Sequence, residues 1–245
     1  MSQATFSPCS TACVARRPPP SPGCNIVRHG YWPRAQPHSP LPPRQDGLVS
    51  FSASDATASR ERAWATARQV IDALVQALPG ELDVALAVHG GSRLHTFTEF
   101  TADPNTLRDR AASIACVAGH TQLLPILSRS LSSPNVRVVT YIGDVYEEFP
   151  ARGRKLADEL GRRGIKLVVL HDIVDWTARR DAELFLDLAR RTGGCVLPFD
   201  ASAPGRLREL LAAIAVFAVG GAKLLQDKRG ELPGAVLLLQ HLGPR

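Results

Sequence analysis

The pattern of hydrophobic and polar positions along this chain becomes regular at residue 48. Apolar and small polar residues alternate over residues 48–54, and a period of two is typical of a β-strand. From Trp64 to Leu78, apolar residues recur at spacings of three and four, which predicts one face of a helix that ends at Pro79. Beyond this helix, short apolar segments alternate with amphipathic stretches. Further strands are predicted at residues 84–88, 94–97, 136–142, 166–170 and 195–198, and further helices at 103–115, 121–131, 148–164, 179–192 and 207–217.

This alternation of strands and helices predicts an α/β fold. Strands that alternate with helices of roughly 10–16 residues imply a doubly wound, mostly parallel sheet with helices on both faces, as in Rossmann-like folds. The exception is the pair of strands on either side of Gly90 and Gly91, which are close enough in sequence to form an antiparallel hairpin. After Gly220, the apolar residues 235–239 predict one more strand, without an assigned place in the sheet.

Residues 1–47 differ from the rest of the chain in composition. They contain ten of the 19 prolines and show no hydrophobic periodicity, so we expect an extended or disordered tail. Such a tail is either a ligand for a proline-binding module or the product of a start codon assigned too far upstream. The expected organisation is a tail at 1–47, a folded domain at 48–219 and a C-terminal extension at 220–245.

The net charge of +6 is concentrated in the tail. Residues 1–47 hold five arginines and one acidic residue, a charge of +4, which leaves +2 for the other 198 residues. A nearly neutral domain gives no electrostatic footprint for nucleic acid.

No apolar run approaches the roughly 20 residues of a membrane span, and the longest, residues 210–222, has the pattern of a core helix. Since no signal-peptide pattern opens the chain, we expect a cytoplasmic protein that binds neither nucleic acid nor membrane.

Oxygen-bearing side chains follow two of the predicted strands and precede one of the predicted helices. Asp55, Thr57 and Ser59 lie on the turn between the first strand and the first helix. Thr121 begins a later helix, and Asp144 follows the strand at 136–142. In an open parallel sheet, ligands bind outside the carboxyl ends of the strands, so these side chains converge in the predicted fold. Carboxylate and hydroxyl oxygens suit Mg²⁺ or Mn²⁺; the alternative is a set of capped turns without an ion, because these residue types are also common helix caps.

The same residues carry a resemblance to a known family. Asp55-Ala56-Thr57-Ala58-Ser59 is similar to the Asp-x-Ser-x-Ser motif of the von Willebrand factor type A (VWA) domain, with threonine in place of the first serine. Gly119-His120-Thr121 resembles the Gly-Gly-Thr loop of that family, and Gly143-Asp144 its strand-end aspartate. In the family these three segments form the metal-ion-dependent adhesion site (MIDAS). The resemblance covers about residues 48–217.

The resemblance implies both the chemistry of the site and its function. Thr57, Ser59 and Thr121 are expected to supply hydroxyl oxygens to the ion, while Asp55 and Asp144 act directly or through bound water. Because the direct ligands are largely neutral, the ion stays electrophilic, and in the family an acidic residue of a partner protein fills its open coordination position. The expected function is therefore divalent-cation-dependent protein interaction, without catalytic residues.

The alternative function is a metal-dependent hydrolase or phosphatase on a related doubly wound fold. Asp55 would then be the nucleophile or a ligand, and Asp144 would hold magnesium. Phosphotransferases of this kind place a second aspartate two residues after the first, to act as acid and base. Thr57 occupies that position and does not transfer protons near neutral pH, which favours the interaction domain over the enzyme.

Two further pairs of residues have more than one interpretation. His171 and Asp172 resemble the dipeptide of metal-dependent phosphohydrolases, although that fold is all-helical and the supporting histidines are absent. Glu147 and Glu148 either add to an acidic rim near Asp144 or start the helix that follows, where acidic residues are favoured. We expect the second role for the two glutamates.

Overall fold

The computed structural model describes residues 45–52, 82–90, 93–112, 122–143, 145–172, 178–199 and 204–242. The chain divides into two compact units, Met1–Leu41 and Pro42–Arg245, and every described residue belongs to the second unit. The helix predicted between Trp64 and Leu78 lies outside the described residues.

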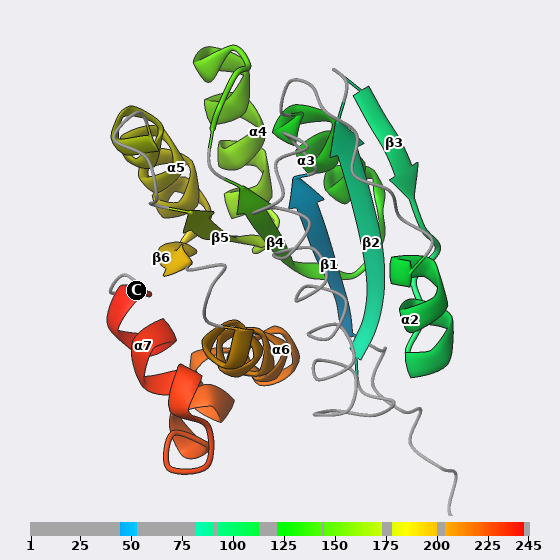
Figure 1. The fold of residues 1–245 in the computed structure, drawn as a ribbon. Helices are drawn as coiled ribbons and strands as arrows, with labels where there is room; N and C mark the ends of the chain where they lie inside the picture. Colours follow the sequence, from blue (N-terminus) through cyan, green and yellow to red (C-terminus); the bar gives the residue numbers. More distant parts are fainter. Residues whose placement is uncertain are drawn as a thin grey trace, which may run out of the picture. The chain divides into compact units, whose positions relative to one another are not determined.

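The described strands form one six-stranded sheet in the order β3-β2-β1-β4-β5-β6 (Figure 1). β2 and β3 pair antiparallel, as predicted, and each of the other four pairs is parallel. The strand order reverses between β1 and β4, which is the kind of position where open α/β sheets bind ligands. The strands are β1 (Gln45–Ser52), β2 (Leu82–Gly90), β3 (Arg93–Phe97), β4 (Val136–Gly143), β5 (Lys166–Asp172) and β6 (Cys195–Phe199).

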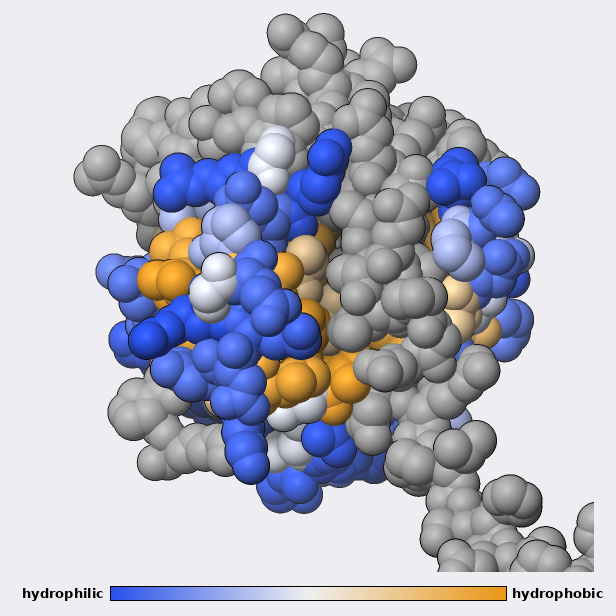
Figure 2. Space-filling model, turned by 90° about the horizontal axis from the view of Figure 1, so that it is seen from below, coloured by the Kyte–Doolittle hydropathy of each residue, from blue (hydrophilic) through white to orange (hydrophobic). Residues whose placement is uncertain are grey.

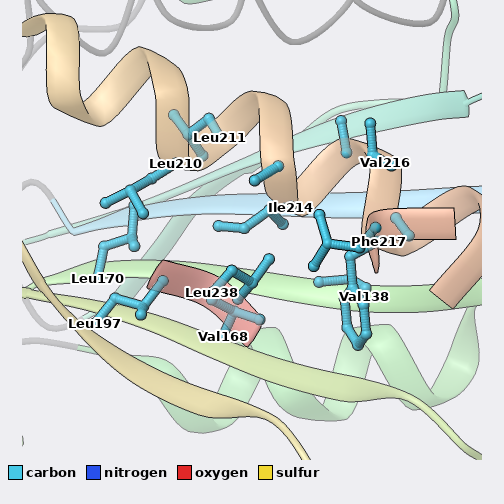
Figure 3. Packing of buried hydrophobic residues seen from close by; sticks show 14 of the residues in the cluster. Val138, Val168, Leu170, Leu197, Leu210, Leu211, Ile214, Val216, Phe217 and Leu238 are labelled. Atoms are coloured by element: carbon cyan, nitrogen blue, oxygen red, sulfur yellow. The ribbon is translucent and has the colours of Figure 1, made fainter. Parts of the chain in front are cut away.

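Helices cover both faces of this sheet, which confirms the predicted doubly wound α/β fold (Figure 1). Helices α3, α4 and α5 pack on one face, and α6 and α7, with Leu107 of α2, pack on the other. Figure 3 shows α6 side chains such as Leu210 and Ile214 pointing toward Val138, Val168 and Leu197 of the strands. The helices are α2 (Pro104–Ala112), α3 (Leu123–Ser132), α4 (Pro150–Arg162), α5 (Ala178–Thr192), α6 (Pro204–Asp227) and α7 (Pro233–His241).

The central strands bury consecutive side chains on opposite faces. Leu167 and Val169 of β5 belong to the core under α3, α4 and α5, while Val168 and Leu170 belong to the core under α6. All four are fully buried. A parallel strand covered on both sides therefore gives a continuous apolar run instead of an alternating one, and such a run is easy to recognise in the sequence.

Strand β1 begins three residues earlier than the sequence pattern predicts. Gln45, Asp46 and Gly47 pair with residues 82–84 of β2, and the last two also pair with β4. Their polar or absent side chains carry no hydrophobic periodicity, so only the later part of the strand is visible in the pattern. The expected boundary at residue 47 thus falls inside β1.

The strand predicted at residues 235–239 is wrong, because this segment lies in helix α7. Five consecutive apolar residues fit a buried strand and a buried helix equally well, so periodicity does not decide between them. Pro233 at the first helical turn favours the helix. Gly234 lets the helix approach α6 closely, since a Cβ at this position would collide with the backbone oxygen of Glu209.

Helix α6 is longer than predicted and continues beyond residue 217 to Asp227. Gly221 interrupts it with φ of 65°, a conformation that glycine adopts readily. Both segments of α6 share one core with α7, because Ile214 before the interruption, Leu225 after it and Leu238 of α7 are all buried there. The segment expected as a C-terminal extension therefore packs with the helices of the domain.

Within the described part of the chain, one helical stretch, Gly205–Asp227, is long and apolar enough to cross a membrane by length and composition. The apolar run visible in the sequence, residues 210–222, is shorter because it is bounded by the charged residues Glu209 and Lys223. Half of the most apolar part of the stretch is buried in the fold, and core helices reach the same length and composition. Hydrophobic side chains are also visible between hydrophilic ones on the face seen from below (Figure 2).

Candidate functional site

The five predicted metal ligands lie outside the described residues, but the elements that lead into them are described. β1 ends at Ser52, three residues before Asp55, and β4 ends at Gly143, directly before Asp144. β1 and β4 are neighbouring parallel strands, with Phe51 opposite Ile142 near their carboxyl ends. The two segments that carry the predicted aspartates therefore leave the sheet from adjacent strands, at the reversal of strand order.

The three predicted hydroxyl ligands are located only through the elements next to them. Thr57 and Ser59 follow β1 in the sequence, and Thr121 precedes α3, which begins at Leu123. Within the described ranges, no group of three or more His, Cys, Asp or Glu side chains is arranged to hold a metal ion. The described part of this edge is the structure around the predicted ligands, above all the loop between β4 and α4.

Tyr146 holds the loop between β4 and α4 against helix α5. Its side chain is buried, and its ring packs edge-on against Phe185 with 5.9 Å between the ring centroids. Its backbone N–H donates to Oδ2 of Asp181, in the first turn of α5, at 3.2 Å. Burial raises the pKa of the Tyr146 hydroxyl, and the nearby negative charge of Glu148 adds to this effect. The hydroxyl stays protonated and donates to the backbone carbonyl oxygen of Phe149 at 3.5 Å, so the side chain both packs against α5 and bonds within the loop.

Glu148 holds the same loop against helix α3. Its Oε2 accepts hydrogen bonds from the backbone N–H groups of Leu123 and Leu124, at 2.6 and 2.8 Å. The first N–H groups of a helix have no partner inside it, and Gln122, at the N-cap position of α3, makes no side-chain capping bond. Burial raises the pKa of Glu148 above its usual 4.5, against the hydrogen bonds from Leu124 and Leu123 that lower it.

This contact replaces the helix-start role that the sequence suggests for Glu148. Helix α4 begins at Pro150, after Glu148, and the glutamate caps a different helix that lies 24 and 25 positions earlier in the chain. A cap at such a distance leaves no pattern in the sequence around either partner. The nearest available signal is the absence of a capping side chain at Gln122, which indicates that the acceptor comes from elsewhere.

An aromatic cluster lies beneath the carboxyl ends of β4 and β5. Phe185 of α5 packs between Tyr141 of β4 and His171 of β5, with centroid distances of 5.5 and 5.3 Å. Gly143 is covered by the same cluster, because a Cβ at this position would lie 2.6 Å from the Tyr141 hydroxyl. His171 is buried in a strand, so the local fold differs from the all-helical fold of the phosphohydrolases that His171 and Asp172 resemble.

Phe149 is the most exposed large hydrophobic residue that the structure describes. It follows Glu148 at the N-cap of α4, and 82% of its surface is accessible to solvent. The loop thus buries Tyr146, directs Glu148 to α3 and presents Phe149 outward, next to the segment that carries Asp144.

Comparisons with known proteins identify the fold. No family model and no curated protein matches the sequence. Among solved structures, the chain is similar to a von Willebrand factor type A protein from Catenulispora acidiphila, with a TM-score of 0.59 and 14% identity over 72% of this chain and 43% of that one. The SpRpn10 VWA domain matches with a TM-score of 0.53 and 14% identity over 68% of this chain and 94% of that domain.

A third similar structure is proximal thread matrix protein 1 from the mussel byssus, whose MIDAS motif is occupied by zinc. It has a TM-score of 0.54 and 12% identity over 70% of this chain and 46% of that one. The described chain therefore has a VWA-like α/β fold. It spans nearly all of the SpRpn10 domain but less than half of the other two chains, and identities this low establish the fold alone.

Proposed function

We propose that this chain is a divalent-cation-dependent interaction domain of the VWA type, without enzymatic activity. The observation that carries the proposal is the adjacency of β1 and β4, because Asp55 and Asp144 follow these two strands at the reversal of strand order. Thr57, Ser59 and Thr121 complete the proposed site.

This donor set fits a hard divalent cation. Two carboxylates and three hydroxyls offer only oxygen, which Mg²⁺ and Mn²⁺ prefer. Hydroxyl ligands are neutral, so they leave positive charge on the ion, and an acidic residue of a partner protein is the chemically matched ligand for its open position. The zinc reported in the MIDAS motif of the mussel protein supports a cation site on this fold and makes zinc a useful comparison in the test.

The exposed Phe149 gives the proposed site an apolar neighbour. Aromatic side chains are enriched among the residues that dominate binding energy at protein interfaces. We propose that the partner places an apolar side chain beside its acidic residue, against Phe149. The proposed setting is the cytoplasm, with a protein partner and neither nucleic acid nor membrane.

The test measures thermal unfolding and calorimetric binding of the full chain with Mg²⁺, Mn²⁺, Ca²⁺ and Zn²⁺. A cation that binds only the folded state stabilises it by RT ln(1 + [L]/Kd), about 2.7 kcal/mol at a hundredfold excess over Kd. We expect Mg²⁺ or Mn²⁺ to raise the unfolding midpoint by several degrees, and Asp144→Ala to abolish this shift. Thr121→Ala should weaken it.

Glu147→Gln is the matched control, because it removes a carboxylate three residues from Asp144 that is not in the proposed donor set. It should leave the Mg²⁺ response unchanged. A wild-type chain that binds none of the four cations contradicts the proposal. A phosphatase and esterase screen with Mg²⁺ or Mn²⁺ addresses catalysis: turnover that Asp55→Asn abolishes would establish the hydrolase instead.

A further inference from the structure

We propose that Glu148 is a positioning residue that fixes the Asp144 loop to the start of helix α3 and thereby sets the cation affinity of the site. This inference rests on the proposed function, since it concerns the same cation site. It assigns a role to a side chain that lies outside the predicted donor set.

Glu148 holds the start of α3 through a pair of hydrogen bonds. One of its carboxylate oxygens accepts both the Leu123 and the Leu124 N–H, at 2.6 and 2.8 Å. A carboxylate at a helix N-terminus is also favoured by the helix dipole. Because Gln122 provides no side-chain cap, Glu148 is the side chain that holds these two N–H groups.

The loop that carries Glu148 is itself held in place. Tyr146 is buried against Phe185, and its N–H is bonded to Asp181 of α5. Two residues further on, Glu148 is bonded to the first N–H groups of α3. The loop is therefore attached to two helices, and α3 cannot shift relative to the loop without loss of the Glu148 bonds.

These contacts lie close in sequence to two of the proposed ligands. Thr121 stands two residues before Leu123, and Asp144 stands four residues before Glu148. Glu148 thus joins two segments of which each carries one proposed ligand. An ordinary helix cap comes from the N-cap residue itself and connects nothing else. Residues that orient metal ligands without binding the ion themselves typically lower metal affinity about 10- to 100-fold when they are replaced.

The experiment measures Mg²⁺ affinity by calorimetry, well below the unfolding midpoint, for the full wild-type chain and its variants. Glu148→Ala removes the acceptor and should weaken Mg²⁺ binding about 10- to 100-fold. Glu148→Gln keeps an amide oxygen that can accept both N–H groups, so it should keep the affinity within a few-fold of wild type. If Glu148→Ala does not fold, Glu148→Asp, which withdraws the carboxylate by one methylene, takes its place.

Asp103→Ala is the matched control. Asp103 caps α2 with the same chemistry, accepting the N–H groups of Asn105 and Thr106 at 3.3 and 3.0 Å. It lies near the amino end of β2, since Thr101 pairs with Val84 there. Its loss should leave Mg²⁺ affinity unchanged.

The possible outcomes separate this inference from the proposed function. Wild-type affinity in a Glu148→Ala variant whose midpoint has fallen would show a purely structural cap and overturn this inference, while the proposed function stands. Equal losses in Glu148→Ala and Asp103→Ala would overturn it as well. A wild-type chain without Mg²⁺ binding overturns the proposed function and this inference together.

Discussion

The amino and carboxyl edges of the sheet are stabilised by different kinds of contact. At the amino edge, local residues close the turns between helices and strands. Gly164 ends the turn after α4 with φ of 75°, and the Ile165 N–H donates to the Leu160 carbonyl oxygen at 2.9 Å. The turn after α5 uses the same left-handed conformation at Gly193, with φ of 65°. A glycine of this kind just beyond a helix is a common way to end it.

The loop after β4 at the carboxyl edge depends on contacts that are remote in the sequence. Glu148 bonds residues 24 and 25 positions earlier, and Tyr146 bonds Asp181, 35 positions later. Contacts of this kind fix one loop against two helices at the edge where the proposed ligands leave the sheet. The turns at the amino edge thus end helices, whereas the loop after β4 fixes the positions of α3 and α5 relative to each other.

The largest expected effect comes from the aromatic cluster beneath the carboxyl edge. Phe185→Ala removes the ring that packs on Tyr141, Tyr146 and His171, and should lower the free energy of unfolding by about 3–5 kcal/mol. Since Tyr146 loses its packing partner, the Mg²⁺ affinity should fall as well. Urea unfolding and calorimetry measure the two effects.

The control for this variant is Leu160→Ala, a fully buried residue of α4 near the amino edge. It should cost about 2–5 kcal/mol and leave Mg²⁺ affinity unchanged in the folded protein. If both variants weaken Mg²⁺ binding to the same extent, the two edges are not independent and the contrast between them does not hold.

The contrast between the edges also explains which features the sequence can predict. The sequence predicts the ends of strands β4, β5 and β6 to within about two residues of their observed positions, because buried parallel strands give continuous apolar runs. The helix ends at Gly164 and Gly193 are visible because their turn chemistry is local. The start at Asp103 and Pro104 is visible for the same reason, and α2 does begin at Pro104.

The features that the sequence does not reveal have non-local or ambiguous causes. Glu148 has the appearance of a helix-start residue when only its neighbours in sequence are considered, and its true partner is α3. Residues 235–239 fit a strand because a short apolar run does not distinguish strand from helix. The candidate ligands follow from their order along the chain; the structure adds the adjacency of β1 and β4, and their side-chain arrangement stays a prediction.

A smaller effect is expected when alanine replaces either of two glycines at opposite edges of the sheet. Gly143 is the last residue of β4, and Gly194 directly precedes β6. Gly143→Ala places a Cβ against the buried Tyr141 ring and should cost about 1–3 kcal/mol. Gly194→Ala should cost more, because its Cβ would collide with the backbone oxygen of Leu167, and a strand backbone yields less than a side chain. Urea unfolding of both variants checks the order; a larger loss for Gly143→Ala would contradict it.

Two truncations examine the amino end of β1. Deletion of residues 1–41 should leave the unfolding midpoint unchanged, because that segment has little apolar surface to bury. Deletion of residues 1–47 also removes Gln45, Asp46 and Gly47, which pair with neighbouring strands. Lost backbone hydrogen bonds of about 1 kcal/mol in total should lower the midpoint by roughly 2–4 °C. Equal midpoints for the two truncations would show that the start of β1 contributes nothing.

The smallest expected effect concerns the two carboxylate caps, Glu148 and Asp103. Their contributions to the free energy of unfolding should change with pH in opposite directions. Burial raises the pKa of Glu148 above 4.5, whereas the hydrogen bonds from Thr106 lower the pKa of the exposed Asp103 below 3.8. A group whose pKa is raised on folding stabilises the protein most below its unfolded value, and that contribution is lost as the pH rises through its folded value. A group whose pKa is lowered contributes above its unfolded value and loses the contribution as the pH falls.

The stability difference between wild type and Glu148→Gln should therefore decrease as the pH rises above 4.5, while the difference between wild type and Asp103→Asn should decrease as the pH falls below 3.8. Urea unfolding of the three proteins over this pH range measures both slopes. Slopes of the same sign would mean that the two caps are equivalent and that Glu148 stabilises α3 as any local cap does. Opposite slopes would mean that ionised Glu148 is held at α3 against a cost of burial, as expected for a side chain whose role is to position the loop next to Asp144.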